Sequence, residues 1–212
     1  MLGFPVALLG VNAFEWYAHK VWLHEFPRKH RNSPFFTHIR HHKRARLNGF
    51  EDEGYTQSMW KDQEMFNEKA ALIGLCVVFT PTVVVAPFFT IGVYYGAWQY
   101  WHKHSKAHLD PEWAKANLPW HYDHHMNTNQ DANWCVTRPW FDYIMGTRVI
   151  GEADIAETNP LGMDLPQWLE KPVNRVARRL LPRAFARLDA NARDESSRQK
   201  SGAVVAIEAD CA

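Results

Sequence analysis

Ten of the twelve histidines in this sequence fall into four short groups, and these groups constrain the fold more than any other feature. Two groups have the spacing H-x-x-H-H, in which residues three and four apart lie on one face of an α-helix, within an arc of roughly 100°. Several imidazoles that face one way form a ligand set for a transition metal such as iron, zinc, copper or nickel. The members are His19 and His24; His38, His41 and His42; His104 and His108; and His121, His124 and His125.

The first group has the spacing H-x4-H, which does not suit a regular helix. A five-residue step turns about 140°, so His19 and His24 are predicted to ligate from a helix end or from a local distortion of the helix. The two remaining histidines are not predicted ligands. His30 lies in a predicted loop among basic residues, and His102 points about 200° away from His104 on a helix.

An apolar run at residues 70–101 separates the second group from the third. A single membrane crossing uses about 20 residues and would place the later histidines on the opposite side from the earlier ones. This run is longer, and Thr80-Pro81-Thr82 and Pro87 interrupt it. We therefore predict a helical hairpin, spanning or re-entrant, that returns the chain to the side from which it came. A buried hairpin in the core of a soluble protein is the alternative.

The remaining blocks divide the chain into a membrane domain, a connection and a tail. Residues 1–18 are apolar and, at about 1.5 Å per residue, nearly long enough to cross a hydrocarbon core. Residues 1–150 are predicted to form the membrane domain. Residues 151–190 form a connection with a basic amphipathic helix, which suits either an anionic membrane surface or packing on the domain. Residues 191–212 are predicted to be a disordered tail.

The predicted fold class is all-α, with membrane-embedded helices and a cytoplasm-facing helical cap that holds a histidine-rich site for two metal ions. The cytoplasmic side follows from the basic residues around the second group, Arg40, Lys43, Arg44 and Arg46. The polar and acidic residues 47–69 are interpreted as a surface segment. A formal net charge of +1 does not indicate a nucleic-acid partner, and the three cysteines lack the paired spacing of a thiolate metal site.

Ten imidazoles exceed what one ion binds, and they suit two ions with four or five nitrogens each. A structural zinc site would be closed and often contains cysteine, and a metal-storage protein would favour a flexible histidine-rich tract. The E-x-x-H motifs of soluble di-iron bundles are absent from the sequence. An all-histidine site beside apolar segments therefore indicates dioxygen activation on an apolar substrate. A non-catalytic metal-binding membrane protein is the alternative.

The ordered histidine set resembles that of the fatty acid hydroxylase/sterol desaturase superfamily of integral-membrane non-haem di-iron oxygenases, over roughly residues 15–148. Downstream, Asn133-Trp134-Cys135-Val136-Thr137 and Phe141-Asp142 to Gly146-Thr147 resemble its N-[YF]-G-V-T…[WF]-D…F-G-T ending. Cys135 stands where that pattern usually has Gly, and Met145 where it often has Phe. The segment AHKVWLH resembles the short bacterial carotenoid hydroxylases of the same superfamily. The superfamily commonly has four membrane helices, whereas this chain has room for about three apolar segments.

This resemblance implies a di-iron centre ligated by the ten histidines, in which zinc could replace iron in purified protein. The enzyme would use O2 and an external electron donor to hydroxylate an unactivated C–H bond in a lipid, with a fatty acyl or sphingolipid-like substrate favoured. The donor would be a ferredoxin, a cytochrome b5-like protein or a reductase. Desaturation, and carotenoid or sterol oxygenation, are the alternatives with the same site.

Two further roles are hypotheses that depend on this resemblance. For each of them, an ordinary surface or packing role is the alternative. Glu15, Asp123 and Asp142 are candidates to orient imidazoles through hydrogen bonds. Trp120, Trp134 and Trp140 are candidates to line a pocket for the acyl chain.

Overall fold

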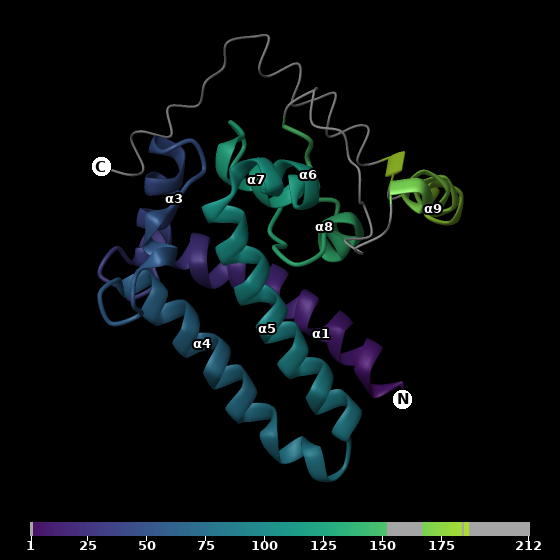
Figure 1. The fold of residues 1–212 in the computed structure, drawn as a ribbon, viewed down its shortest axis with the longest axis horizontal. Coiled ribbons are helices and arrows are strands. Elements are labelled where there is room, and N and C mark those ends of the chain that lie inside the picture. Colours follow the sequence, from purple (N-terminus) through teal and green to yellow (C-terminus); the bar gives the residue numbers. More distant parts are fainter. Residues whose placement is uncertain (1, 152–166, 184, 187–212) are drawn as a thin grey trace.

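The computed structural model describes residues 2–151, 167–183 and 185–186, and within them every regular element is a helix. The predicted all-α class is therefore confirmed (Figure 1). The predicted tail at residues 191–212 lies outside the described residues. The elements are α1 (Gly3–Tyr17), η1 (Ala18–Glu25), α2 (Phe26–Lys29), α3 (Phe36–Leu47), η2 (Glu53–Thr56), α4 (Gln63–Phe79), η3 (Thr80–Val84), α5 (Pro87–Leu109), α6 (Pro111–Asn117), α7 (Pro119–Met126), α8 (Trp140–Met145) and α9 (Gln167–Leu180).

The apolar run forms an antiparallel hairpin of α4 and α5, joined by the short 3-10 helix η3 (Figure 1). Asp62 caps the start of α4, where its side chain accepts from the backbone N–H groups of Glu64 and Met65 at 2.8 and 3.2 Å. Pro87 occupies the start of α5, where the missing N–H has no helical partner to lose. The hairpin therefore turns where the sequence has its Thr-Pro-Thr and Pro interruptions.

The stretch Gln63–Val84 is the one part of the described chain with the length and hydropathy of a membrane-crossing helix. Length and composition alone are weak evidence, because core helices of soluble proteins pass the same test. Here, however, none of the apolar window is buried against the rest of the protein. Val77 is 64% exposed and Val84 85% exposed. This exposure contradicts the alternative in which the hairpin is the buried core of a soluble domain.

Helix α5 is central, with α4 on one side and α1 crossing it on another (Figure 1). Two glycines four residues apart allow α1 to approach closely. A Cβ atom at Gly92 would lie 2.7 Å from the Cβ of Ala7, and one at Gly96 would lie 2.9 Å from Cγ1 of Val11. Such small residues let helix backbones pack closely in membrane proteins, where apolar burial between helices contributes little.

The remaining helices gather at the end of the hairpin that lies away from its turn. Helices α3, α6, α7 and α8 lie there in Figure 1, and the last turns of α5 reach the same end. A buried apolar cluster, which includes Phe50, Leu118 and Trp120, packs α5, α6 and α7 together. Helix α8 ends at Gly146, whose φ of 72° is the left-handed conformation common after a helix. All four histidine groups are therefore brought to one end of the molecule.

Helix α9 corresponds to the predicted basic amphipathic segment. It packs on the domain through Ala177, which together with Phe185 contacts Tyr143 of α8. Val176 and Leu180, by contrast, are exposed. Packing on the domain thus involves only part of this helix.

Candidate metal centre

The helix continues from α1 into η1 as a π-helix, and this distortion explains the H-x4-H spacing. In a π-helix the backbone bonds run from residue i to residue i+5, so residues five apart lie above one another. The rings of His19 and His24 are accordingly buried with their centroids 5.1 Å apart. The expectation that this pair would need a local distortion is confirmed.

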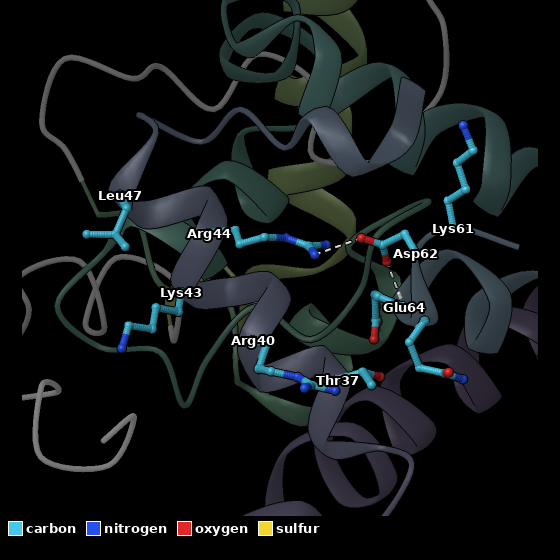
Figure 2. A pocket seen from close by; sticks show the side chains of 9 residues that line it. Thr37, Arg40, Lys43, Arg44, Leu47, Lys61, Asp62 and Glu64 are labelled. Carbon is cyan, nitrogen blue, oxygen red and sulfur yellow. Dashed lines mark hydrogen bonds and ion pairs between the residues drawn. The ribbon is translucent and has the colours of Figure 1, made fainter. Parts of the chain in front are cut away.

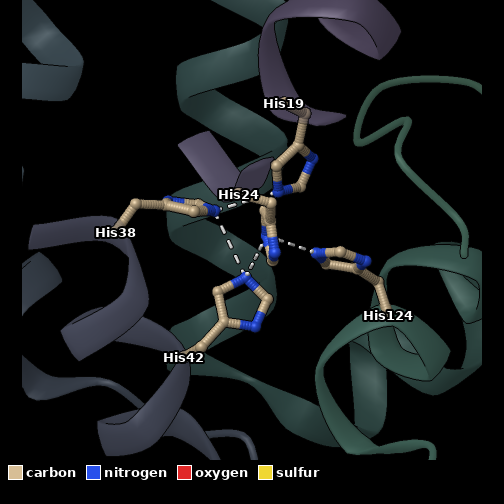
Figure 3. Close-up of side chains that lie close together, drawn as sticks. All are labelled: His19, His24, His38, His42 and His124. Atoms are coloured by element: carbon tan, nitrogen blue, oxygen red, sulfur yellow. Dashed lines mark hydrogen bonds between the residues drawn. The ribbon is translucent and has the colours of Figure 1, made fainter. Parts of the chain in front are cut away.

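Nine of the ten predicted ligands form two groups in which one ligand atom from each residue lies within 4.8 Å of the others. The first group, shown in Figure 3, has five histidines and the second has four. We call them the five-histidine group, with His19, His24, His38, His42 and His124, and the four-histidine group, with His41, His104, His108 and His125. His121 belongs to neither set, but its Nε2 lies 3.3 Å from that of His108.

The two groups are in contact, since the rings of His42 and His125 stack at 4.0 Å with an interplanar angle of 13°. Each H-x-x-H-H motif serves both groups. His38 and His42 belong to one group and His41 to the other, and the neighbours His124 and His125 divide in the same way. The spacing predicted that the three histidines of each motif face one way. In the structure they lie on one side of the helix but divide between the two histidine groups. The two excluded histidines, His30 and His102, are exposed.

Six of the ten imidazoles use Nδ1 to contact a hydrogen-bond acceptor, which fixes the orientation of the ring. The carbonyl oxygens of Trp134, Phe50 and Ala132 accept from His19, His108 and His124 at 2.6, 2.8 and 2.7 Å. The carboxylates of Glu64, Asp52 and Glu68 contact His38, His41 and His104 at 3.1, 2.6 and 3.0 Å. A neutral imidazole that donates from Nδ1 carries a lone pair on Nε2.

The Nε2 atoms converge, and those of the six histidines with an Nδ1 acceptor, which include His19 and His38, have no proton to share. Those of His19 and His38 are 2.9 Å apart, and that of His42 lies 3.2 Å from both His24 and His38. Buried Nε2 atoms of His41 and His104 have no hydrogen-bond partner. Facing lone pairs repel each other, and an unsatisfied buried nitrogen is costly. A cation within each group would satisfy these nitrogens, so the donor set fits bound metal ions.

Protons do not supply that positive charge at neutral pH. Burial, reinforced by the neighbouring imidazoles, lowers the pKa of His42 and His125 well below its ordinary value. The pKa of His124 is lowered to about 3, again chiefly by burial. These three imidazoles are therefore neutral and available as metal ligands at pH 7.

These lowered pKa values predict that the metal-free protein loses stability in acid. Below the unfolded-state pKa of about 6.5, the unfolded chain binds more protons than the folded chain, so the free energy of unfolding falls as the pH drops from 6.5 towards 3. We expect chelator-treated protein in detergent to melt at a lower temperature at pH 5.5 than at pH 7.5. Equal melting temperatures at the two pH values would contradict the burial of neutral histidines.

The interpretation of residues 47–69 as a surface segment is wrong for the side chains that contact the histidines. Asp52 and Glu64 are buried, and Asp52 also accepts from Arg44 at 3.0 Å. Tyr55 adds a further contact, since its hydroxyl donates to Glu68 at 2.8 Å and lies 2.9 Å from Nδ1 of His104. One signal pointed to two of these residues: Glu64 and Glu68 are four apart and share a face at the start of an apolar helix.

The three carboxylates proposed to orient imidazoles contact backbone N–H groups or an arginine. Glu15 accepts from the backbone N–H groups of Val136 and Thr137, and Asp142 from those of Trp134 and Cys135 at 2.8 and 2.9 Å. Asp123 pairs with Arg148 at 2.7 Å. Glu15 and Asp142 therefore hold the loop that contains Trp134. The Trp134 carbonyl in turn contacts His19, so these two carboxylates orient His19 indirectly.

Cys135, the departure from the expected glycine, is fully buried in this loop. Its Sγ lies 3.9 Å from Oδ1 of Asn12 on α1. The Cys135 side chain, which a glycine would lack, is thus accommodated beside α1. Both groups of histidines form with Cys135 at this position.

An apolar slot of about 500 Å³ leads to the five-histidine group. Its walls come from α1, η1, α3, α4 and α5. Its polar lining includes Glu15, His19, Thr37, His38, Glu64, Asn67 and Glu68. The apolar lining includes Val11, Phe14, Ala18, Trp22, Leu72, Leu75, Val78, Phe79 and Ala97. The slot therefore runs along the exposed apolar hairpin towards one of the two candidate metal positions.

The three tryptophans that were candidates to line an acyl pocket do not line this slot. Trp120 lies in the buried cluster with Phe50 and donates Nε1 to the Val136 carbonyl at 2.9 Å. Trp134 packs against the rings of His19, His24 and His124, and Trp140 faces Arg138. Trp22 of η1 is the tryptophan that lines the slot.

The model of the family described as fatty acid hydroxylase matches residues 4–147, a range that contains all ten histidines of the site. No curated protein and no solved structure matches the chain.

Proposed function

The chain belongs to the fatty acid hydroxylase family, and from this premise we propose that it hydroxylates an unactivated C–H bond of a lipid with O2, at two iron ions held by its histidines. Family membership gives an oxygenase of hydroxylase or desaturase type with a histidine-rich metal site. The identity of the metal, the choice of hydroxylation and a fatty acyl or sphingolipid-like substrate are our proposal. Its single strongest support is the apolar slot that ends at His19 and His38.

Each of the two histidine groups would hold one ion. The five-histidine group would hold one ion, and the four-histidine group the other, with His121 beside it. When bound, the two irons would supply the electron-transfer chemistry that activates O2 for attack on a C–H bond. In six of the ten histidines, carbonyls and carboxylates keep the proton on Nδ1, so that the Nε2 lone pair is available to an ion.

The slot would select and orient the substrate. Its lining is largely apolar, which favours an aliphatic chain over water and leaves that chain few polar contacts. Because His19 and His38 line the slot and the members of the four-histidine group do not, the chain would approach the five-histidine group. Glu64 and Glu68 line the same end, and there they hold the rings of His38 and His104.

We also propose that the protein is an integral membrane protein with its site on the cytoplasmic side. The exposed apolar face of the hairpin supports the membrane location. The basic residues of α3, at the opposite end from the hairpin turn, support the cytoplasmic side.

Isotope labelling tests the proposed function. Iron-loaded protein in lipid nanodiscs, given a total lipid extract, a ferredoxin-based reducing system and 18O2, is expected to yield hydroxylated lipid with one 18O atom. A new double bond without 18O would instead indicate a desaturase. An oxygenated carotenoid or sterol would show that the substrate is not a fatty acyl or sphingolipid-like chain. Retained metal with no O2 consumption above background would contradict the proposal and support a non-catalytic metal-binding protein.

A further inference from the structure

The proposed reaction needs electrons from outside the protein. In R–H + O2 + 2 e⁻ + 2 H⁺ → R–OH + H2O, one oxygen atom enters the substrate and the other leaves as water. Two electrons and two protons must therefore arrive for each turnover. Building on the proposed function, we propose that an acidic one-electron carrier protein docks on a basic face formed by α3 and the segment before α4.

This α3 basic face surrounds a surface hollow of about 530 Å³, shown in Figure 2. Four cationic side chains line it: Arg40, Lys43, Arg44 and Lys61. Two carboxylates also line it, but Asp62 is paired with Arg44 at 2.8 Å and Glu64 is buried against His38. Within the described part of the chain, Arg40, Lys43 and Lys61 have no ion-pair partner. The face is therefore positive and complements an acidic surface.

The arrangement of the cations favours a macromolecule over a small anion. In Figure 2, Lys43 and Lys61 point away from each other, and Arg44 lies between them, held by Asp62. A site for one phosphate group would need cationic donors that converge on a single point. Cations spread over a broad face instead steer a large partner of opposite charge.

A short chain of hydrogen bonds connects this face to the four-histidine group. Arg44, whose side chain is 39% exposed, donates to Oδ2 of Asp52 at 3.0 Å. The same oxygen lies 2.6 Å from Nδ1 of His41, which is fully buried. A carrier docked over Arg44 would thus be two hydrogen bonds from a candidate metal ligand, and electron transfer falls steeply with distance.

The proposed routes for electrons and for substrate would then lead to different histidine groups, although the hollow and the slot share Thr37 and Glu64 in their linings. The slot reaches His19 and His38 of the five-histidine group, whereas the α3 basic face reaches His41 of the four-histidine group. The stacked rings of His42 and His125 join the two groups.

The test measures binding of a reduced plant-type [2Fe–2S] ferredoxin, chosen for its acidic surface, to the full-length, iron-loaded protein in nanodiscs of neutral lipid. We expect the double variant Arg40→Glu/Lys43→Glu to raise the Kd at least tenfold and to flatten its dependence on salt. The matched control is Arg175→Glu/Arg179→Glu, which makes the same charge change on exposed residues of α9. The control is expected to change the Kd less than twofold. Metal content and melting temperature report whether each variant folds.

A second readout is the rate at which ferredoxin reduces the bound metal, compared with the rate for dithionite. The α3 variant should slow reduction by ferredoxin more than tenfold and leave reduction by dithionite unchanged. Equal effects of the α3 and α9 variants, or no salt-sensitive binding to the parent protein, would overturn the proposal. So would displacement of ferredoxin by inorganic phosphate beyond that by chloride of equal ionic strength, which would indicate a small-anion site. Docking that persists without 18O-labelled product would count against the proposed function and not against this surface.

Discussion

The variant His124→Ala is expected to lose metal and to hydroxylate lipid more than ~100-fold more slowly than the parent protein. His124 is fully buried, its Nε2 lies 3.3 Å from that of His24, and its Nδ1 donates to the Ala132 carbonyl at 2.7 Å. Loss of a residue that merely orients a ligand typically costs about 10–100-fold in metal affinity or activity, so loss of a ligand should cost more. Metal content by mass spectrometry and 18O-labelled product are the measurements.

The matched control is His30→Ala, which removes an exposed histidine outside both groups. Its metal content and rate should equal those of the parent, because its ring contacts Phe26 and no proposed ligand. His102→Ala, which removes an exposed ring stacked on Trp98, should behave in the same way. Equal losses from His124→Ala and His30→Ala would show that the ligands have been wrongly separated from the bystanders.

Enlarging Leu75 to tryptophan is expected to reduce lipid hydroxylation by about 10-fold or more while the metal content stays the same. Leu75 lines the slot from α4, on the path towards His19 and His38. A larger side chain there would fill space that the substrate needs, and even one methylene of misfit in an apolar pocket changes rates by about 10–200-fold. Shorter substrates should suffer less than longer ones, which chain-length analysis of the products would reveal.

Ile73→Trp provides the control for this change. Ile73 lies on the same helix, two residues earlier, but is 59% exposed and does not line the slot. It adds the same bulk to the outward face of α4 and should leave the rate and the product profile close to those of the parent. If Ile73→Trp and Leu75→Trp lowered the rate equally, the slot would not be the path of the substrate.

Local signals in the sequence were sufficient to predict the all-helical class, the returning hairpin and the separation of ten histidines from His30 and His102. Thr80-Pro81-Thr82 and Pro87 mark the turn. Proline interrupts the interior of a helix whatever the surrounding tertiary structure. The spacing of His19 and His24 excluded a regular helix, and the π-helix η1 is the distortion that this spacing required. Each of these inferences depends on residues that are close together in the chain.

The parts that could not be predicted depend on contacts between distant segments. Asp52 reaches His41, and Glu64 reaches His38, only because the segment between α3 and α4 folds back over the histidines. Polar composition alone suggested exposure there. The slot likewise has walls from five separate elements, so no single stretch identifies its lining. Trp120, Trp134 and Trp140 were candidates to line an acyl pocket, yet Trp120 belongs to the buried cluster that packs α5, α6 and α7 together.

The division of each H-x-x-H-H motif between two groups also exceeds what spacing can show. Adjacent histidines on a helix differ in direction by about 100°, so His41 and His42 can serve one ion or two. The distances place them in different groups, since His42 approaches His24 and His38 while His41 joins His104, His108 and His125.

An anomalous-difference map of the iron-loaded protein, recorded at the iron absorption edge, tests the central claim most directly. We predict two peaks, one surrounded by the five-histidine group and one by the four-histidine group with His121 nearby. A single peak, a peak outside these histidines, or no peak in protein with all ten histidines intact would contradict the account.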